Sequence, residues 1–197
     1  MLHIIPFGAL DAGVRLNLPT RLEGELYYPM NVLNVASGIV PRINFDGFLA
    51  YAKRGWQNTP YSYLQVFRNG ILEAVDSILI PGGNDSEIDH ARLEGVVLDG
   101  VGRYLAVQKS LGIEPPLCIM LTLIGVKDSR LFAHRVGGPV ASEPIDRNIL
   151  QIPEVVLHTF ECEPDVIMRP IFDAIGNAGG WPGSQSYNDQ GRWAGNR

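Results

Sequence analysis

Four candidate metal ligands, Asp85, Glu87, Asp89 and His90, lie within six residues of one another. Carboxylate oxygens and imidazole nitrogens are common ligands of divalent cations. On a helix these side chains would fan around the axis, so that only Glu87 and His90 share a face and further ligands must come from elsewhere. The helix dipole also stabilises acidic residues in the first turn, which gives these acids a purely structural explanation. We therefore predict a helix start here, with neither a metal nor a cofactor.

Cys118 is the candidate nucleophile, with His134 or His158 as its base. It lies in an apolar run, without the glycine-rich elbow or helix N-terminus that would lower the pKa of its thiol. No Gly-x-Ser-x-Gly sequence indicates a serine hydrolase. The other cysteine, Cys162, lacks metal-ligand spacing, and both fit reduced, buried thiols. The sequence predicts no catalytic residue.

A glycine-rich loop at residues 81–86 leads into the expected helix. Amides at a helix N-terminus bind anions. However, this loop lacks the lysine and following hydroxyl of a phosphate loop, and the acids at 85, 87 and 89 would repel phosphate. We interpret it as a capped turn, with Asp85 or Ser86 as the helix cap.

The first group of candidate binding residues is basic and aromatic. Lys53, Arg54 and Trp56 precede a predicted hairpin, and Arg68 lies beside the turn of that hairpin. Cations interleaved with aromatic rings bind single-stranded nucleic acid by pairing with phosphates and stacking on bases. Three cations form a thin patch, so we keep direct nucleic-acid binding as an alternative.

Two further groups complete the candidate binding residues. Lys127 and Arg130 follow an apolar strand, where they either contact an acidic partner or form a solvated turn. Trp181, Tyr187 and Trp193 lie in a polar C-terminal tail, residues 181–197. Large aromatic side chains are costly to expose, so we expect the tail to pack on the domain or on a partner.

The composition indicates a folded domain with an acidic surface. The chain has 197 residues, 46% of them hydrophobic, and a net charge of −5 from 16 basic and 21 acidic side chains. This length suits one domain with its own core. The charge opposes nucleic-acid binding over the whole surface, since counterion release needs a basic face. No apolar run has the length of a membrane span or a signal peptide, so we expect a cytoplasmic protein with no membrane contact.

The elements that would position these residues form an α+β domain. Residues 61–76 alternate around Asn69-Gly70, which predicts an antiparallel hairpin with a two-residue turn. Residues 117–124 lack alternation and predict a central strand covered on both faces. Helices are expected from Asp85 or Ser86 to Leu111 and over 163–177. Because hairpins precede the first helix, we predict an antiparallel or mixed sheet covered by two helices.

The predicted domain covers residues 1–180, and residues 11–44 form a long irregular segment within it. A strand that begins at the first residues is consistent with the second half of a longer protein.

Six segments together resemble the region that follows the Schlafen-type AlbA DNA-binding domain in bacterial ATP-binding or helix-turn-helix proteins. The resemblance spans residues 2–193, and the AlbA-like domain itself is absent from this chain. It implies an accessory role beside a nucleic-acid-binding domain and assigns no catalytic residue. The segments are LHIIPFGAL, NFDGFLAYA, SYLQVFRNGILEAVDS, PPLCIMLTLIGVKD, PIDRNILQIPEVVL and RPIFDAIGNAGGWPGSQSYNDQGRW.

The leading hypothesis is a non-catalytic accessory or interaction module of a nucleic-acid-associated bacterial protein. Its expected partners are an AlbA-like domain or a second copy of the chain. The first alternative is a small-molecule enzyme or ligand sensor with its pocket beneath residues 11–44. The second is direct binding of single-stranded nucleic acid.

Overall fold

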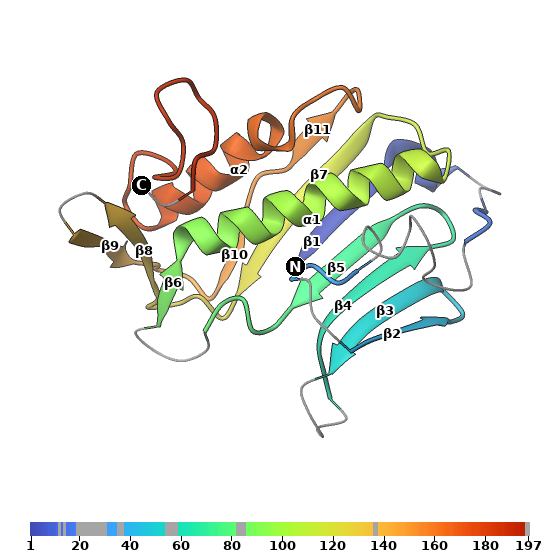
Figure 1. Ribbon diagram of the computed structural model, residues 1–197, viewed down its shortest axis with the longest axis horizontal. Helices are drawn as coiled ribbons and strands as arrows, with labels where there is room; N and C mark the ends of the chain where they lie inside the picture. The colour runs from blue at the N-terminus through green and yellow to red at the C-terminus, as the bar shows by residue number, and fades with distance from the viewer. Residues whose placement is uncertain are drawn as a thin grey trace.

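The computed structural model describes residues 1–11, 13, 15–18, 31–34, 38–53, 59–81, 86–135 and 138–195. They form an α+β fold with one large sheet, one small sheet and two long helices, as Figure 1 shows. The loop at 82–85 and much of the segment 11–44 lie outside the described residues.

The large sheet has eight strands, and all of its pairings are antiparallel. Seven follow the order β10-β7-β1-β5-β4-β3-β2, and β11 pairs with the same edge of β7 as β10 does, further along that strand. The strands are β1 (Leu2–Pro6), β2 (Ile39–Ile43), β3 (Gly47–Lys53), β4 (Pro60–Phe67), β5 (Leu72–Asp76), β7 (Leu117–Ile124), β10 (Ile149–Gln151) and β11 (Val155–Leu157).

A second sheet stands at one end of the molecule (Figure 1) and was not predicted from the sequence. In it, β8 (Arg130–Arg135) pairs in parallel with β6 (Glu87–Asp89) and antiparallel with β9 (Gly138–Pro144). Its strands are short or irregular in register, with a shift between Arg130 and Phe132. Such strands show little of the period-two pattern on which strand prediction depends.

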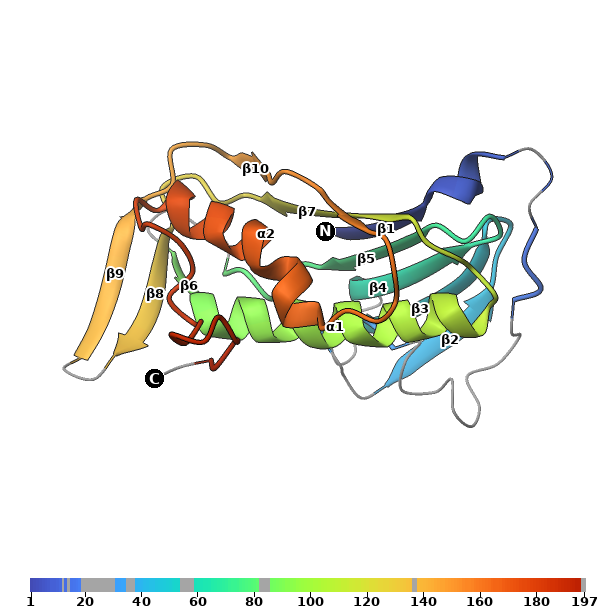
Figure 2. The same cartoon turned by 90° about the horizontal axis from the view of Figure 1, so that it is seen from above.

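The helices are α1 (His90–Ser110) and α2 (Pro164–Ala178), with a 3-10 turn at Phe7–Leu10. Both helices lie on the same side of the large sheet (Figure 2). The core forms between them and the alternate strand residues that face them, and it includes Phe48, Leu64 and Tyr104. In the part of the chain that the structure describes, neither helix combines the length and hydropathy needed to cross a bilayer.

The start of α1 corrects the prediction from the sequence. Asp89 is the N-cap, and its side chain accepts a hydrogen bond from the amide of Arg92 at 2.9 Å. Glu87 and Asp89 therefore lie in β6 rather than on a helix. The end of the helix is as expected, because Gly112 adopts φ +75° directly after it.

The turn of the hairpin formed by β4 and β5 is one residue longer than the sequence predicted. Val66 pairs with Leu72, and the amide of Phe67 donates to the carbonyl of Ile71 at 2.8 Å. Three residues (68–70) therefore form the turn instead of two. Gly70 alone among them has a positive φ, of +89°, which is the arrangement of a type I turn followed by a glycine bulge.

Strand β7 also differs from the prediction, because it is covered on only one face. Its residues alternate between buried and more exposed positions, with Leu117 and Ile119 in the core and Met120 and Ile124 exposed. Consecutive side chains of a strand point to opposite faces, so the apolar residues of one set face away from the helices. The long apolar run therefore has one face buried under the helices and one apolar face left uncovered.

Residues 31–33, within the segment 11–44, are anchored to α1. The buried guanidinium of Arg103 donates to the carbonyls of Asn31, Val32 and Leu33 at 2.9–3.2 Å. The hydroxyl of Tyr104 donates to the Asn31 carbonyl at 3.0 Å. These contacts replace the backbone partners that a strand or helix would otherwise provide.

Candidate functional site

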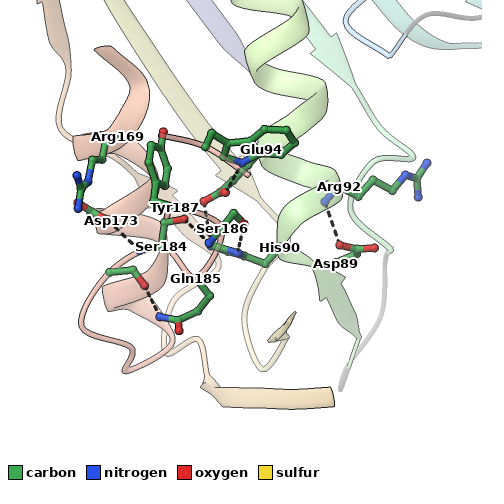
Figure 3. A network of polar contacts seen from close by, with 12 residues as sticks. Asp89, His90, Arg92, Glu94, Arg169, Asp173, Ser184, Gln185, Ser186 and Tyr187 are labelled. Atoms are coloured by element: carbon green, nitrogen blue, oxygen red, sulfur yellow. Dashed lines mark hydrogen bonds and ion pairs between the residues drawn. The ribbon is translucent and has the colours of Figure 1, made fainter. Parts of the chain in front are cut away.

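A buried network of polar side chains joins α1 to the C-terminal tail. His90 and Glu94 lie one helical turn apart on α1, with Nε2 of the imidazole 3.0 Å from Oε1 of the carboxylate. The hydroxyl of Ser186 lies 3.3 Å from Nδ1 of His90. Trp193 donates its indole N–H to the other Glu94 oxygen at 2.9 Å. Figure 3 shows His90, Glu94 and Ser186 converging between the helix and the tail.

A serine, a histidine and a carboxylate in contact are the groups of an acyl-transfer triad. Here, however, His90 and Glu94 are 0% exposed and Ser186 is 2% exposed. A nucleophile must reach its substrate, and Ser186 itself lies on the segment that closes over the pair. The arrangement therefore acts as a polar clamp that holds the tail on α1.

The aromatic residues of the tail pack against the fold, one of the two outcomes expected for them. Trp181 meets the His90 ring edge-on, with centroids 5.3 Å apart and planes at 84°. The Tyr187 hydroxyl donates to the Asp165 carbonyl at 2.6 Å, and burial raises the pKa of this phenol. Together with the Trp193 bond to Glu94, these contacts occupy all three aromatic side chains within the domain.

Lys127 and Arg130 lie at the end of the molecule that carries the small sheet, away from Lys53 and Arg68. Lys127 is exposed after β7, and Arg130 begins β8 of the small sheet. The Arg130 guanidinium donates to the Ser142 carbonyl at 2.7 Å and so supports the β8–β9 pair. Lys53, in contrast, ends β3 near the opposite edge of the large sheet (Figure 1). The candidate binding residues thus fall into separate groups.

Lys53 lies at a hollow of about 420 Å³ on the face of the large sheet that points away from the helices. Its ammonium lies 5.3 Å from the centroid of the Tyr51 ring, and the guanidinium of Arg42 lies 5.7 Å from the same ring. Both distances are within the range of cation–π attraction. Tyr63 pairs with Tyr51 across β3 and β4 and also lines the hollow.

Arg68 lies at a second hollow, of about 570 Å³, at the other end of β4. Its Nε donates to the Phe45 carbonyl at 3.3 Å. Arg15, Phe45 and Phe67 line the hollow with it. Arg54 and Trp56, predicted to bind together with Lys53 and Arg68, lie outside the described residues.

The same open face carries an aliphatic patch on β1, β7, β10 and β11. Directly paired residues of antiparallel strands point to one face. The pairings Ile5 with Cys118, Cys118 with Val156, and Ile124 with Ile149 therefore place all of these side chains on that face. We define the aliphatic patch as Ile5, Met120, Ile124, Ile149 and Val156.

The two cysteines are not buried as expected. Cys118 is half-buried on the open face, and Cys162 is exposed. Desolvation, with a smaller contribution from the charge of Glu154, raises the pKa of the Cys118 thiol. Raising this pKa reduces the thiolate fraction and so its reactivity. Within the described ranges, no group of three or more His, Cys, Asp or Glu side chains is placed to hold a metal.

Sequence reasoning missed Arg42, Tyr51 and Tyr63 as members of one hollow. The alternation of β4 does place Tyr63 and Phe67 on the same face, so part of the signal is present in the sequence. Arg42 reaches Tyr51 only through the pairing of β2 with β3, and that register has no local marker.

Tyr63 allows the geometry of the open face to be tested by titration. Its hydroxyl donates to Glu73 at 2.7 Å. Burial and this carboxylate raise the pKa of the phenol from 10.0 to about 12. In a pH titration followed by phenolate absorbance near 295 nm, we expect the Tyr63→Phe protein to lack a phenol that ionises near pH 12.

The raised pKa of Tyr63 also fixes the direction in which the stability of the fold changes with pH. The folded protein favours the neutral phenol, so this contribution to stability is complete below pH 10 and is lost as the pH rises to about 12. In Glu73→Gln the phenol should ionise at lower pH. If Tyr63→Phe instead removes a phenol that ionises near pH 10, the contact with Glu73 does not form in solution.

Comparison of the chain with models of protein families, with curated proteins and with solved structures gives no match.

Proposed function

We propose that this protein is a non-catalytic interaction module that associates through the aliphatic patch on its open sheet face. The supporting observation is the exposure of Met120, Ile124, Ile149 and Val156, which are 37–53% accessible on one face of the sheet. Contiguous exposed apolar side chains are typical of protein–protein contact surfaces. The partner that we propose for this surface is a second copy of the chain.

The resemblance to the region after Schlafen-type AlbA domains suggests the setting for such a module, beside a nucleic-acid-binding domain. A module of this kind needs a stable scaffold and a contact surface, and it needs no accessible nucleophile. The burial of Ser186, His90 and Glu94 agrees with that requirement.

The alternative of an enzyme or sensor with a pocket beneath residues 11–44 has less support. In the described part of that segment, Leu33 packs directly on α1, where its Cδ1 would lie 2.4 Å from a β-carbon added at Gly100. Val32 and Leu33 are buried, so this stretch fills the space above the helix.

The test is the oligomeric state of the full chain, measured by sedimentation velocity over a range of concentrations without added nucleic acid. We expect a concentration-dependent dimer. Ile124→Lys places a charge in the patch and should weaken dimerisation at least about tenfold, because a buried unpaired charge opposes association.

Val166→Lys is the matched control. Val166 lies on α2 and is 53% exposed, the same fraction as Ile124, but it is remote from the open face. It should dimerise as the natural sequence does. A chain that stays monomeric to its solubility limit, or equal weakening by both substitutions, would rule out association through the patch.

A further inference from the structure

The two hollows at the ends of β4 concentrate positive charge on an acidic protein. Four cations line them, Arg42 and Lys53 at one and Arg15 and Arg68 at the other. Among the residues that the structure describes, Asp46 is the one acidic residue that lines either hollow, and Glu73 lies beside the first, where it accepts from the Tyr63 hydroxyl. The whole chain, in contrast, carries 16 basic and 21 acidic side chains. The local charge is therefore opposite in sign to the net charge of −5.

Aromatic rings accompany these cations at both ends. Tyr51 and Tyr63 line the first hollow, and Phe45 and Phe67 line the second. Phe45 is 95% exposed, so its ring has almost no packing role within the fold. An aromatic side chain held this far into solvent beside arginines is a ready stacking surface.

The hollows also have a defined separation. Tyr63 and Phe67 are four residues apart on β4 and point to the same face, which places them about 13 Å apart at the usual rise of a strand. An extended ligand that alternates flat rings with negative charges would contact both hollows. A single small anion would contact only one.

We propose that these two hollows form a binding site for single-stranded nucleic acid. Phosphates pair with the four cations, and unpaired bases stack on the aromatic rings at each end of β4. Stacking of this kind needs bases that are free of a complementary strand, since the faces of paired bases are covered by their neighbours. Since stacking and phosphate pairing do not read the edges of the bases, we expect no particular base sequence to be required.

This site is separate from the aliphatic patch. It lies on β2, β3 and β4, the turns that follow β2 and β4, and Arg15, whereas the patch lies on β1, β7, β10 and β11. Binding of nucleic acid and self-association can therefore fail independently. Measurements on the monomeric Ile124→Lys protein would show binding without dimerisation.

The experiment is fluorescence anisotropy with a fluorescein-labelled oligo(dT) 20-mer and the full chain. We expect saturable binding at low salt, with a slope of log affinity against log salt near −3, since single strands contribute about −0.7 for each neutralised phosphate. Arg42→Gln/Lys53→Gln should weaken binding at least about tenfold and reduce the slope to about −1.5. Phe45→Ala should weaken binding roughly fivefold or more without changing the slope.

The control removes two cations that lie outside the site. Lys127→Gln/Arg147→Gln changes the net charge by the same amount, and Arg147 is well exposed in a loop. It should bind as the natural sequence does. Equal weakening by both double variants, an unchanged affinity in Phe45→Ala, or tighter binding of duplex than of single strand would each overturn the proposal. If Arg42→Gln/Lys53→Gln does not fold by circular dichroism, Arg15→Gln/Arg68→Gln tests the other hollow with the same expectation.

Discussion

Replacement of Glu94 by alanine is expected to lower the free energy of unfolding by about 1–3 kcal/mol, the cost of leaving a buried hydrogen-bond donor without its acceptor. The change removes the acceptor of the Trp193 indole N–H and the carboxylate that lies 3.0 Å from Nε2 of His90. His90 and Glu94 are 0% exposed, so bulk solvent does not reach this carboxylate. Denaturant unfolding followed by tryptophan fluorescence measures the loss.

A double variant separates the pair from simple loss of packing. In His90→Leu/Glu94→Leu both polar groups of the pair are removed and the space is filled, so we expect it to be more stable than Glu94→Ala, with the Trp193 indole N–H lacking its acceptor in both variants. Glu143→Ala is the surface control, because Glu143 is 84% exposed and lies 3.9 Å from Arg130. It should change stability by no more than about 0.5 kcal/mol. If Glu94→Ala behaves like this control, the tail is not clamped in solution.

Arg103→Leu is expected to destabilise the fold by about 3 kcal/mol or more, since buried acceptors lose charge-assisted donors. Three consecutive backbone carbonyls at Asn31, Val32 and Leu33 lose their guanidinium partner. We also expect faster proteolysis at residues 31–34, because these contacts hold the segment on α1. Thermal unfolding and limited proteolysis measure the two effects.

Arg92→Leu makes the same chemical change on the exposed side of the same helix. It should leave stability within about 0.5 kcal/mol and leave proteolysis unchanged. Arg103→Lys should lie between the two, because one ammonium cannot reproduce the planar fork of donors. Similar losses in Arg92→Leu and Arg103→Leu would show that the segment is held by other contacts.

The sequence by itself determined the class of fold and several local elements. The glycines at the ends of the helices account for the two terminations, with Gly112 at φ +75° and Gly180 at φ +78°. The alternation of residues 61–67 predicted two sets of side chains on opposite faces of β4, and the structure shows that the set with Ser62, Leu64 and Val66 is buried. These features depend on neighbours a few residues apart, and the amino-acid types report them directly.

Other features follow from the register between distant strands and helices, which local patterns do not encode. The apolar run of β7 was consistent with two covered faces, and only the placement of both helices on one side leaves Met120 and Ile124 exposed. The same holds for the parallel pairing of β6 with β8. A strand pattern shows which residues share a face but not what lies against that face.

The tertiary structure alone decided the sites. Ser186 meets His90 across 96 residues, and Trp193 meets Glu94 across 99, so no spacing motif reveals the clamp. Arg42 and Lys53 reach the Tyr51 ring through strand pairing and side-chain direction. Residue types identified cations and aromatics as candidates, whereas three-dimensional proximity decided which aromatics pack inward and which face solvent. Burial and proximity are properties of the whole folded chain. For this reason the sequence predicted the class of fold and some local elements, but not the buried clamp or the exposed hollows and aliphatic patch.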